Sequence, residues 1–291
     1  MLLDSADAFG VEATRYRGEL LVHCNRMLGT IDEAEDAVQE AFARAWQGRE
    51  TFRRSVSLRA WLYRIATNVC LNVIESRKRD PMLAIGPFPD HLLVDFGGPE
   101  ARYDAHESIS LAFLTVLQVL PSRQRAVLLL RDVLTFRAVE VAALLDMSVP
   151  AVNSAHQRAR AALRSSFSQP RQSPLPHLLL ERYVRAWEAA DVAGLVALLR
   201  EDAVLAMPPR QMVTGAGRIG DFVGEAIFTL GPMRLIETRA NGSPAFALYV
   251  QRRLFALLVL AGDDLHIRRM DAFTDPRQLA RFDLPPQLDE D

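Results

Sequence analysis

The sequence predicts a multidomain protein: two all-α helical modules, the second with a helix-turn-helix, followed by an α+β cone with a curved antiparallel sheet. Three observations predict this order. Proline is absent between Asp7 and Arg79, and apolar residues recur there at helical spacing. Two stretches rich in chain-breaking residues, 79–99 and 168–176, interrupt the helical pattern. The last third changes to short apolar runs between turn residues, which is typical of strands.

The composition excludes several classes of protein. Of the 291 residues, 49% are apolar and 24% charged, which is enough to bury an ordinary core. Cys24 and Cys70 are too few for a disulfide scaffold or a zinc site, so we expect no metal and no cofactor. The N-terminus lacks a secretory pattern, and no apolar stretch reaches about 18 residues. We therefore expect a cytoplasmic protein without a membrane partner.

The net charge is only −2, but acidic and basic residues are concentrated in different segments of the chain. Met1–Phe52 carries ten acidic and five basic residues, whereas Arg53–Asp80 carries two acidic and seven basic ones. Arg123–Arg164 is again basic, with seven basic and three acidic residues. An acidic segment followed by two basic ones suits one protein partner and nucleic acid.

Shifts in composition place the boundaries between the parts of the chain. We expect a helical domain, a linker, a helix-turn-helix domain, a second linker and a cone, at 7–79, 80–103, 104–166, 167–176 and 177–285. The spacing in the first domain predicts helices over 9–28, 31–48 and 57–77. Thr30 is the expected cap of the second helix, with acidic residues in its first turn favoured by the helix dipole.

The second helix is predicted to have one apolar stripe and one acidic face. The expected core residues are Ala34, Val38, Ala41, Phe42, Ala45 and Trp46. Asp36, Gln39 and Glu40 fall on other faces. Such a face either receives a basic partner protein or is simply solvated.

This helix belongs to a longer recognisable run. The stretch DEAEDAVQEAFARAW at 32–46, then SLRAWLYRIATNVCLN at 57–72 and a basic cluster, resembles the first conserved module of bacterial RNA polymerase sigma factors of the extracytoplasmic-function group. In that family the acidic helix docks on a coiled coil of the polymerase core. The resemblance implies core RNA polymerase as a partner, contacted by Asp36, Gln39 and Glu40.

Aromatic and basic residues alternate after the acidic helix. Melting duplex DNA requires aromatic faces, polar pockets for a flipped base and cations for the backbone. Most apolar residues here are equally expected in the core, so the polar ones are the candidates. The resemblance implies that the loop at 53–57 captures a flipped minus-ten base, that residues beyond it face the non-template strand or upstream duplex, and that the final basic cluster contacts phosphates. The minus-ten candidates are Arg53, Arg54, Ser55, Ser57, Trp61, Arg64, Asn68, Asn72, Arg77, Lys78 and Arg79.

Residues 135–163 have the proportions of a helix-turn-helix: a helix over 135–145, a turn, and a second helix over 149–163. Ser148 is the expected cap, and Pro150 is harmless in the first turn. The inward positions are Val152, Ala155, Ala159 and Leu163. The outward positions suit the major groove, although a generic helix pair would look similar; they are Asn153, Ser154, Gln157, Arg158 and Arg160.

The stretches around this motif also resemble the sigma factor family. LPSRQRAVL at 120–128 and NSAHQRARAAL at 153–163 match its second conserved module, which reads the minus-thirty-five element. The resemblance implies promoter DNA as a second partner.

The last third is predicted to contain three helices and five strands. We expect helices at 177–190, 192–199 and 216–228, and strands at 203–207, 232–240, 244–250, 253–261 and 264–273. Asn241-Gly242 is a strong turn signal between two of the strands. The run LLERYVRAWEAADVAGLVALLREDAVLAMPP at 179–209 resembles the opening of the SnoaL-like, ketosteroid-isomerase-like cone fold.

A cone of this kind offers an apolar pocket that either holds an unknown ligand or fills itself. The pocket candidates are Tyr183, Trp187, Met207, Phe222, Phe246 and Asp271. An enzyme would need a tuned acid or base among Asp202, His266 and Asp271, and each also suits a turn or strand-edge role. We expect no catalysis.

Sigma factors with this extra domain form a subset of their family. PFPDHLL at 87–93 resembles a linker motif of that subset, although Ile85-Gly86 replaces the usual Trp-Leu. DPRQL at 275–279 matches a C-terminal motif only in part. Both departures bear on whether regulation follows the pattern of the subset.

We therefore expect a sigma factor that binds core RNA polymerase, recognises minus-ten and minus-thirty-five promoter elements and initiates transcription. Its cone is expected to modulate activity by contacting the helical modules, because the linker at 168–176 is short. Two alternatives remain open: a helix-turn-helix regulator that does not bind polymerase, and a cyclase-like or isomerase-like enzyme with an accessory helical half.

Overall fold

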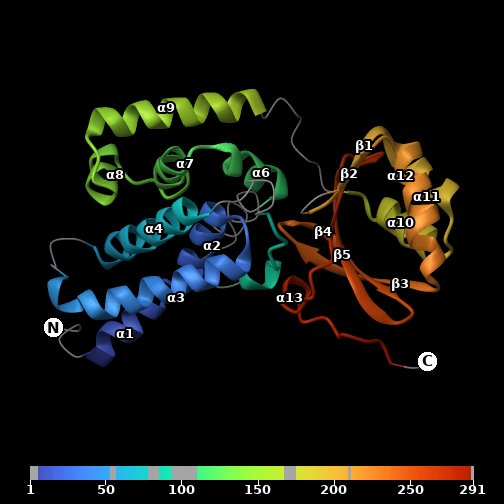
Figure 1. Ribbon diagram of the computed structural model, residues 1–291, viewed down its shortest axis with the longest axis horizontal. Helices are drawn as coiled ribbons and strands as arrows, with labels where there is room; N and C mark the ends of the chain where they lie inside the picture. The colour runs from blue at the N-terminus through green and yellow to red at the C-terminus, as the bar shows by residue number, and fades with distance from the viewer. Residues whose placement is uncertain are drawn as a thin grey trace. The chain divides into compact units, whose positions relative to one another are not determined.

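The computed structural model describes residues 6–52, 57–77, 85–93, 110–166, 175–208 and 211–289. The chain divides into two compact units (Figure 1). The helical unit comprises Met1–Ile85 and His91–Gln169, and the cone unit comprises Gly86–Asp90 and Pro170–Asp291. A short segment between the two helical modules thus belongs structurally to the cone.

The first module of the helical unit contains α1 (Ala6–Thr14), α2 (Arg17–Leu28), α3 (Ile31–Gly48) and α4 (Leu58–Ser76), with a short 3-10 turn, η1 (Arg49–Thr51), after α3. The helix expected over 9–28 is in fact two helices, broken by a turn at residues 15–16. Helix α2 ends at Gly29, whose φ of 94° lies in the left-handed region that glycine tolerates.

Helix α3 packs on its neighbours mainly through small side chains. Ala34, Ala37, Ala41 and Ala45 are all buried, which allows α2 and α4 to pack closely against it. The expectation that Trp46 belongs to the core is wrong: it is 43% exposed, and the Arg49 guanidinium lies 4.7 Å from its ring centre.

Thr30 occupies the N-cap position of α3 as predicted, but its hydroxyl does not cap the backbone. It donates instead to the Glu33 carboxylate, at 2.8 Å.

The second module contains α6 (Leu111–Val119), α7 (Ser122–Leu128), a π turn η4 (Leu129–Val133), α8 (Ala138–Leu145) and α9 (Val149–Ser166). Helix α8 begins at Ala138 rather than at Thr135, because Thr135 has a φ of 58° and cannot continue a helix. The two modules form one unit because α6 and α7 pack on α2, and α7 and α8 pack on α4.

The cone unit is built on a six-stranded sheet in the order β2-β1-β6-β5-β4-β3. Its strands are β1 (Leu199–Met207), β2 (Gln211–Thr214), β3 (Met233–Ala240), β4 (Ser243–Val250), β5 (Arg253–Gly262) and β6 (Ile267–Phe273). Neighbouring strands are antiparallel except β1 and β6, which are parallel, so the sheet is mixed. Strand β2 was not predicted.

Helices cover one face of this sheet (Figure 1). They are α10 (His177–Glu188), α11 (Val192–Leu198) and α12 (Ala216–Phe222), and α12 continues as the turns η5 (Val223–Ile227) and η6 (Phe228–Leu230). A short helix, α13 (Pro276–Leu279), follows β6. The β3–β4 turn has positive φ at Asn241 (55°) and Gly242 (72°), which confirms the predicted hairpin turn.

One buried histidine makes the stability of the helical unit depend on pH. His23 is fully buried on α2, with Nε2 2.9 Å from the Thr67 hydroxyl oxygen. Burial, with the positive charges of Arg26 and Arg59, lowers the pKa of His23 to about 3. In the unfolded chain the pKa is about 6.5, so between pH 6.5 and 3 the unfolded state binds the extra proton.

We expect the free energy of unfolding to fall as pH drops below 6.5, by about 1.4 kcal/mol per pH unit from this residue. His23→Gln should remove that slope, so wild type and variant should differ by about 2 kcal/mol in their change between pH 6.5 and 5. Urea unfolding followed by far-UV circular dichroism measures both slopes. His177→Gln, at an exposed histidine, is the control. A wild-type slope in His23→Gln contradicts the assignment.

Candidate nucleic-acid interface

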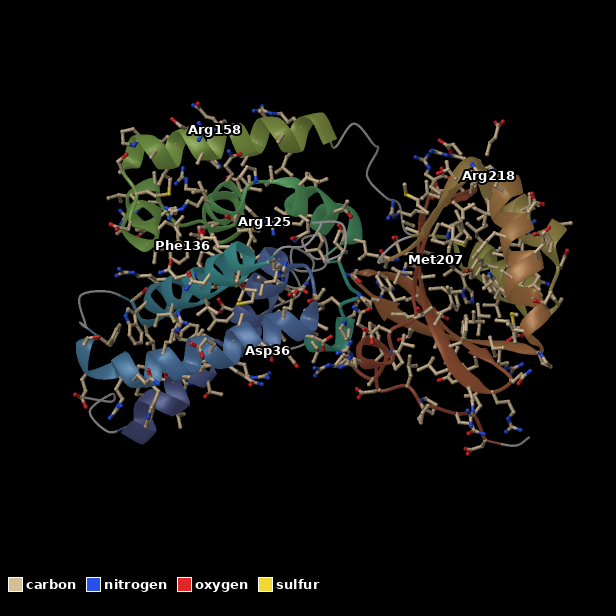
Figure 2. The ribbon with its side chains drawn as sticks, in the orientation of Figure 1. Asp36, Arg125, Phe136, Arg158, Met207 and Arg218 are labelled. Atoms are coloured by element: carbon tan, nitrogen blue, oxygen red, sulfur yellow. The ribbon has the colours of Figure 1, made fainter. Side chains whose placement is uncertain are left out.

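The outer face of α3 is acidic and accessible. Asp36, Gln39 and Glu40 are all exposed, and Figure 2 shows Asp36 on this face. Glu40 accepts a hydrogen bond from Arg44 Nε at 2.7 Å. An exposed pair at this spacing contributes only about 0.3–0.5 kcal/mol, so Glu40 remains available to a cationic partner.

A groove between α3 and α4 lies beside this face. It encloses about 260 Å³ and is lined by Arg44, Trp61, Arg64, Ile65 and Asn68. Two guanidinium groups, an amide and an indole are the combination that single-stranded nucleic acid requires, for phosphates, base edges and stacking respectively. Three of these residues were minus-ten candidates from the sequence.

The Trp61 ring, which forms the aromatic wall of the groove, packs against two phenylalanine rings. The ring centres of Trp61 and Phe52 lie 5.2 Å apart, and Phe9 contacts Trp61 edge-on at 6.1 Å. Arg44 was missed because the sequence placed it on the acidic helix, whereas the fold turns it toward α4. Arg44 follows Glu40 by one helical turn, and this spacing was the feature of the sequence that could have drawn attention to it.

The remaining minus-ten candidates fall into three groups: one is exposed, some already make hydrogen bonds within the module, and the others lie outside the described residues. Asn72 is exposed on α4. Ser57 caps α4, because its hydroxyl oxygen accepts a hydrogen bond from the Ala60 N–H at 3.1 Å. Arg53, Arg54, Ser55, Lys78 and Arg79 lie outside the described residues.

The expectation that Arg77 contacts phosphate is wrong for the folded unit. Its guanidinium donates to the Leu28 carbonyl at 3.1 Å and pairs with Glu33, and only 13% of its side chain is exposed. Arg77 therefore joins α4 to the end of α2 and the start of α3.

The helix-turn-helix is formed as predicted. Helices α8 and α9 are bent by 102° relative to each other, within the range of DNA-binding motifs. Asp146 closes α8 with a φ of 52°, and the Ser148 hydroxyl caps α9 by accepting the Ala151 N–H at 3.3 Å.

The faces of α9 also follow the prediction. Val152, Ala155 and Ala159 are buried, and Leu163 is half-buried. The predicted outward residues are all exposed: Asn153, Ser154, Gln157, Arg158 and Arg160. Figure 2 shows Arg158 on the outer side of α9.

Arg160 differs from its neighbours because it has an acidic partner. Asp132 on η4 contacts His156 Nε2 at 2.6 Å through one oxygen and Arg160 Nε at 3.6 Å through the other. One carboxylate thus spans two successive turns of α9 and fixes the helix to the module. Arg158 has no such restraint among the interactions of the described residues.

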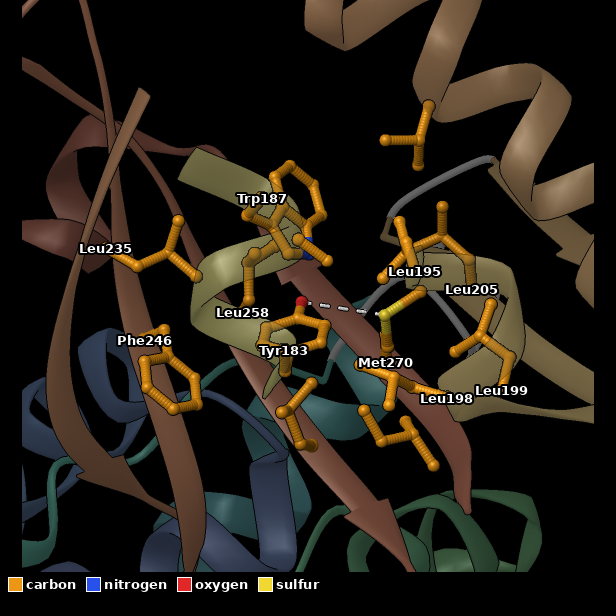
Figure 3. Close-up of a cluster of buried hydrophobic side chains, with 14 of the residues drawn as sticks. Tyr183, Trp187, Leu195, Leu198, Leu199, Leu205, Leu235, Phe246, Leu258 and Met270 are labelled. Carbon is orange, nitrogen blue, oxygen red and sulfur yellow. Dashed lines mark hydrogen bonds between the residues drawn. The ribbon is translucent and has the colours of Figure 1, made fainter. Parts of the chain in front are cut away.

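The interior of the cone is filled by its own side chains. Tyr183, Trp187 and Phe246 belong to one buried cluster, and Met207 and Phe222 pack against it. Figure 3 shows the Tyr183 hydroxyl directed at the Met270 sulfur, 3.6 Å away. A shallow hollow of about 380 Å³, lined by residues of α10, β3 and β4, lies beside this cluster.

Asp271 does not line the same pocket, so that expectation is wrong. Residues alternate along β6, and Met270 and Ala272 belong to the buried cluster, so Asp271 points to the opposite face of the sheet. There it forms a two-pronged pair with Arg269, at 2.8 and 2.7 Å. Burial raises the pKa of Asp271, and the Arg269 pairing opposes that rise.

The other two acid-base candidates, Asp202 and His266, lie outside the buried cluster of the cone, on a strand and in a turn respectively. Asp202 is exposed and paired with Arg200, which lowers the pKa of its carboxyl group. His266 donates its backbone N–H to Asp263 in the β5–β6 turn. Within the described residues, no group of histidine, cysteine or acidic side chains is arranged to hold a metal ion. No single helix in the same residues is long and apolar enough to cross a membrane.

Family comparisons match both helical modules. The family described as Sigma-70 region 2 matches residues 13–80, and the family described as Sigma-70, region 4 matches residues 110–163. These matches contain the α3–α4 groove and the helix-turn-helix respectively.

Individual relatives extend the match to the cone. The ECF RNA polymerase sigma factor SigG of Mycobacterium tuberculosis is 38% identical, over 96% of this chain and 85% of SigG. The probable ECF RNA polymerase sigma factor SigI of the same organism is 24% identical, over 91% of this chain and 92% of SigI. The crystal structure of the M. tuberculosis extracytoplasmic function sigma factor SigJ has the same fold, with a TM-score of 0.66 and 22% identity over 95% of this chain and 100% of SigJ.

The unequal restraint of the two arginines on α9 predicts unequal effects. Arg158→Ala should weaken binding of the full chain to a minus-thirty-five duplex by about 1–3 kcal/mol if the contact is to a base edge. Arg160→Ala should cost less, because Asp132 already holds that side chain. Fluorescence anisotropy against cognate and scrambled duplexes measures both. An equal loss of Arg158→Ala binding on the scrambled duplex reassigns the contact to phosphate.

Proposed function

The chain belongs to the extracytoplasmic-function RNA polymerase sigma factors. We propose that it works in the cytoplasm, where it directs core RNA polymerase to promoters, and that it does so through three surfaces of its helical unit. These are the acidic face of α3, the groove between α3 and α4, and the outer face of α9. Each surface is accessible and differs in chemistry from the others, which suits three different contacts.

The α3 face fits a basic protein surface. Asp36 and Glu40 are exposed one turn apart, so a cationic helix of core polymerase can approach both without rearrangement of the module. The polar neighbour Gln39 adds a hydrogen-bonding group to the same face.

The groove fits the melted minus-ten strand. Arg64 and Asn68 lie one turn apart on α4 with Arg44 opposite them on α3, and the Trp61 indole forms one wall. An unstacked base can lie against the indole while the guanidinium groups neutralise flanking phosphates. A groove of this kind separates the proposal from a regulator that uses only a helix-turn-helix.

The observation that carries the proposal is the presence of this groove and of an exposed α9 face in one helical unit. Duplex reading and strand opening are both needed to initiate transcription, and each has its own surface here. Run-off transcription with purified core polymerase on a promoter library tests it, because a factor that supports no initiation on any template contradicts the proposal.

We expect Asp36→Arg combined with Glu40→Arg to abolish holoenzyme formation, because charge complementarity is lost and the fold is kept. Glu40→Arg also faces Arg44 at one-turn spacing, which costs only a few tenths of a kcal/mol. Affinity for core polymerase measured by pull-down and by size exclusion reports the effect. Glu50→Arg, at an exposed acid after the same helix, is the matched control. Unchanged affinity of the double variant refutes the assignment.

The cone is proposed to modulate this activity without turning over a substrate. Its interior is filled by aromatic side chains, and Asp271 lies on the other face of the sheet. What supports modulation is the segment Gly86–Asp90, which is part of the cone unit although it lies between the DNA-binding modules in sequence.

The segment is bound by the β3–β4 turn. Phe88 is fully buried; its N–H donates to Asn241 Oδ1 and its carbonyl accepts the Asn241 N–H, both at 2.9 Å. Pro89 pairs with Ala240 as an isolated bridge. The strong turn signal of the sequence thus also forms a peptide-binding site.

Asp90 completes the binding of the segment. Its carboxylate accepts the Gly242 N–H at 2.8 Å and lies 3.3 Å from Arg239 Nε. The Asp90 side chain is only 9% exposed, whereas the Arg239 side chain is 57% exposed, so the backbone hydrogen bond is the more sheltered of the two contacts. A cone that holds the connection between the two modules can bias how they are arranged.

We expect Asp90→Ala in the full chain to change run-off transcription at least twofold, in the same direction as truncation after Ser168, because both release the segment from the cone. Asp264→Ala, at an exposed turn of the same unit, should leave transcription unchanged. Opposite effects of Asp90→Ala and the truncation, or wild-type activity in both, argue against modulation through this segment.

A further inference from the structure

The Asn241-Gly242 pair that forms the β3–β4 turn can also react with itself. In an Asn-Gly pair the glycine nitrogen can attack the side-chain amide of the asparagine, because glycine has no side chain to block the approach. Gly242 N gives up its proton and forms a bond to Asn241 Cγ, while Nδ2 leaves with that proton as ammonia. Water then opens the cyclic succinimide and leaves aspartate or isoaspartate at position 241. The sequence contains no other Asn-Gly pair.

The bound segment holds both partners of this reaction. Asn241 is fully buried, and its Oδ1 accepts the Phe88 N–H at 2.9 Å, which directs the side-chain amide toward the segment. The Gly242 N–H donates to Asp90 Oδ1 at 2.8 Å. Arg239 Nη2 donates to the Gly242 carbonyl at 3.1 Å, so the glycine is held on both sides. The attacking nitrogen and the amide under attack are therefore each engaged by another residue.

The Asp90 carboxylate also opposes the reaction through its charge. Gly242 N attacks only after it has lost its proton, and a negative charge beside it disfavours that loss. Only 9% of the Asp90 side chain is exposed, so solvent screens this charge weakly. The Arg239 guanidinium lies 3.3 Å away and offsets part of the charge, but 57% of its side chain is exposed to water.

We propose that Asn241 is a deamidation site that the bound segment masks, and that Asn241 deamidates when the segment leaves the cone. The inference deepens the proposed modulation through this segment and rests on it. Release of the segment removes the Phe88 and Asp90 contacts together. Gly242 N then approaches the Asn241 amide without a competing hydrogen bond and without a carboxylate beside it.

Either product of deamidation opposes rebinding of the segment. An aspartate at position 241 brings a second carboxylate to the site of Asp90, because residues 241 and 242 both bind the segment. Isoaspartate inserts an extra carbon atom into the backbone. The two-residue turn between the paired residues Ala240 and Ser243 has no room for that atom without loss of register. Deamidation therefore makes a reversible release permanent.

The test is the deamidation rate of the full chain, followed by peptide mass spectrometry during incubation at mildly alkaline pH. Asp90→Ala removes the acceptor of the Gly242 N–H and should raise the rate at Asn241 about tenfold, as expected from the loss of one charge-assisted hydrogen bond. Arg239→Ala should raise the rate less, because Asp90 keeps its hydrogen bond. Arg218→Ala, at an exposed arginine of the same unit that Figure 2 labels, should leave the rate unchanged.

Every digest carries an internal reference. Asn153, exposed on α9 and followed by Ser154, should deamidate equally in all variants. The urea-unfolded wild type gives the rate of the unmasked pair. Circular dichroism checks folding, and Arg239→Ala changes an exposed side chain, so it decides the question if Asp90→Ala disturbs the cone. Wild-type rates in both variants overturn the proposal, and so does a native rate equal to the unfolded one.

Hydrogen exchange at the Phe88 amide shows whether the segment rebinds. This amide should be protected in fresh wild type, and in the purified deamidated fraction it should exchange as fast as in Asp90→Ala. Asn241→Asp reproduces one product and should lose part of the protection. Retained protection in the deamidated fraction overturns the permanent release. Neither measurement uses transcription, so a run-off assay that does not respond to Asp90→Ala refutes the proposed modulation and leaves the masking of Asn241 decided by these rates.

Discussion

The packing of the helical unit depends on the hydrogen bonds that the last carbonyl groups of α2 accept. Three consecutive carbonyl groups there accept hydrogen bonds from Arg77, which directly follows α4, and from side chains of α6 and α7, on the other side of the linker between the modules. Because unpaired buried carbonyls are costly, these donors fix where the second module packs. The same end of α2 is closed by Gly29, whose left-handed backbone turns the chain into α3 and leaves the carbonyls accessible.

This arrangement separates stability from function within the helical unit. The first module keeps its own apolar core, since the inner faces of α2, α3 and α4 are buried against one another. The contact between the modules includes hydrogen bonds from Arg125 and Gln118 and ring contacts of Phe136. The groove and the outer face of α9 lie away from that contact and stay exposed. The surfaces proposed to bind DNA therefore do not have to be uncovered by separating the two modules.

Periodicity predicted most helical segments and the inward side of α9, although it joined α1 and α2 into one helix, and the Asn-Gly dipeptide predicted the turn at Asn241-Gly242. Each of these features depends on residues close in sequence. The sequence also placed Trp61, Arg64 and Asn68 in one region, and the structure brings them to one groove. What it could not predict are pairings between distant residues. Arg77 looked like a phosphate ligand until the fold placed it against Glu33, 44 positions away. Asp271 likewise needed the register of β6 to show which face it occupies.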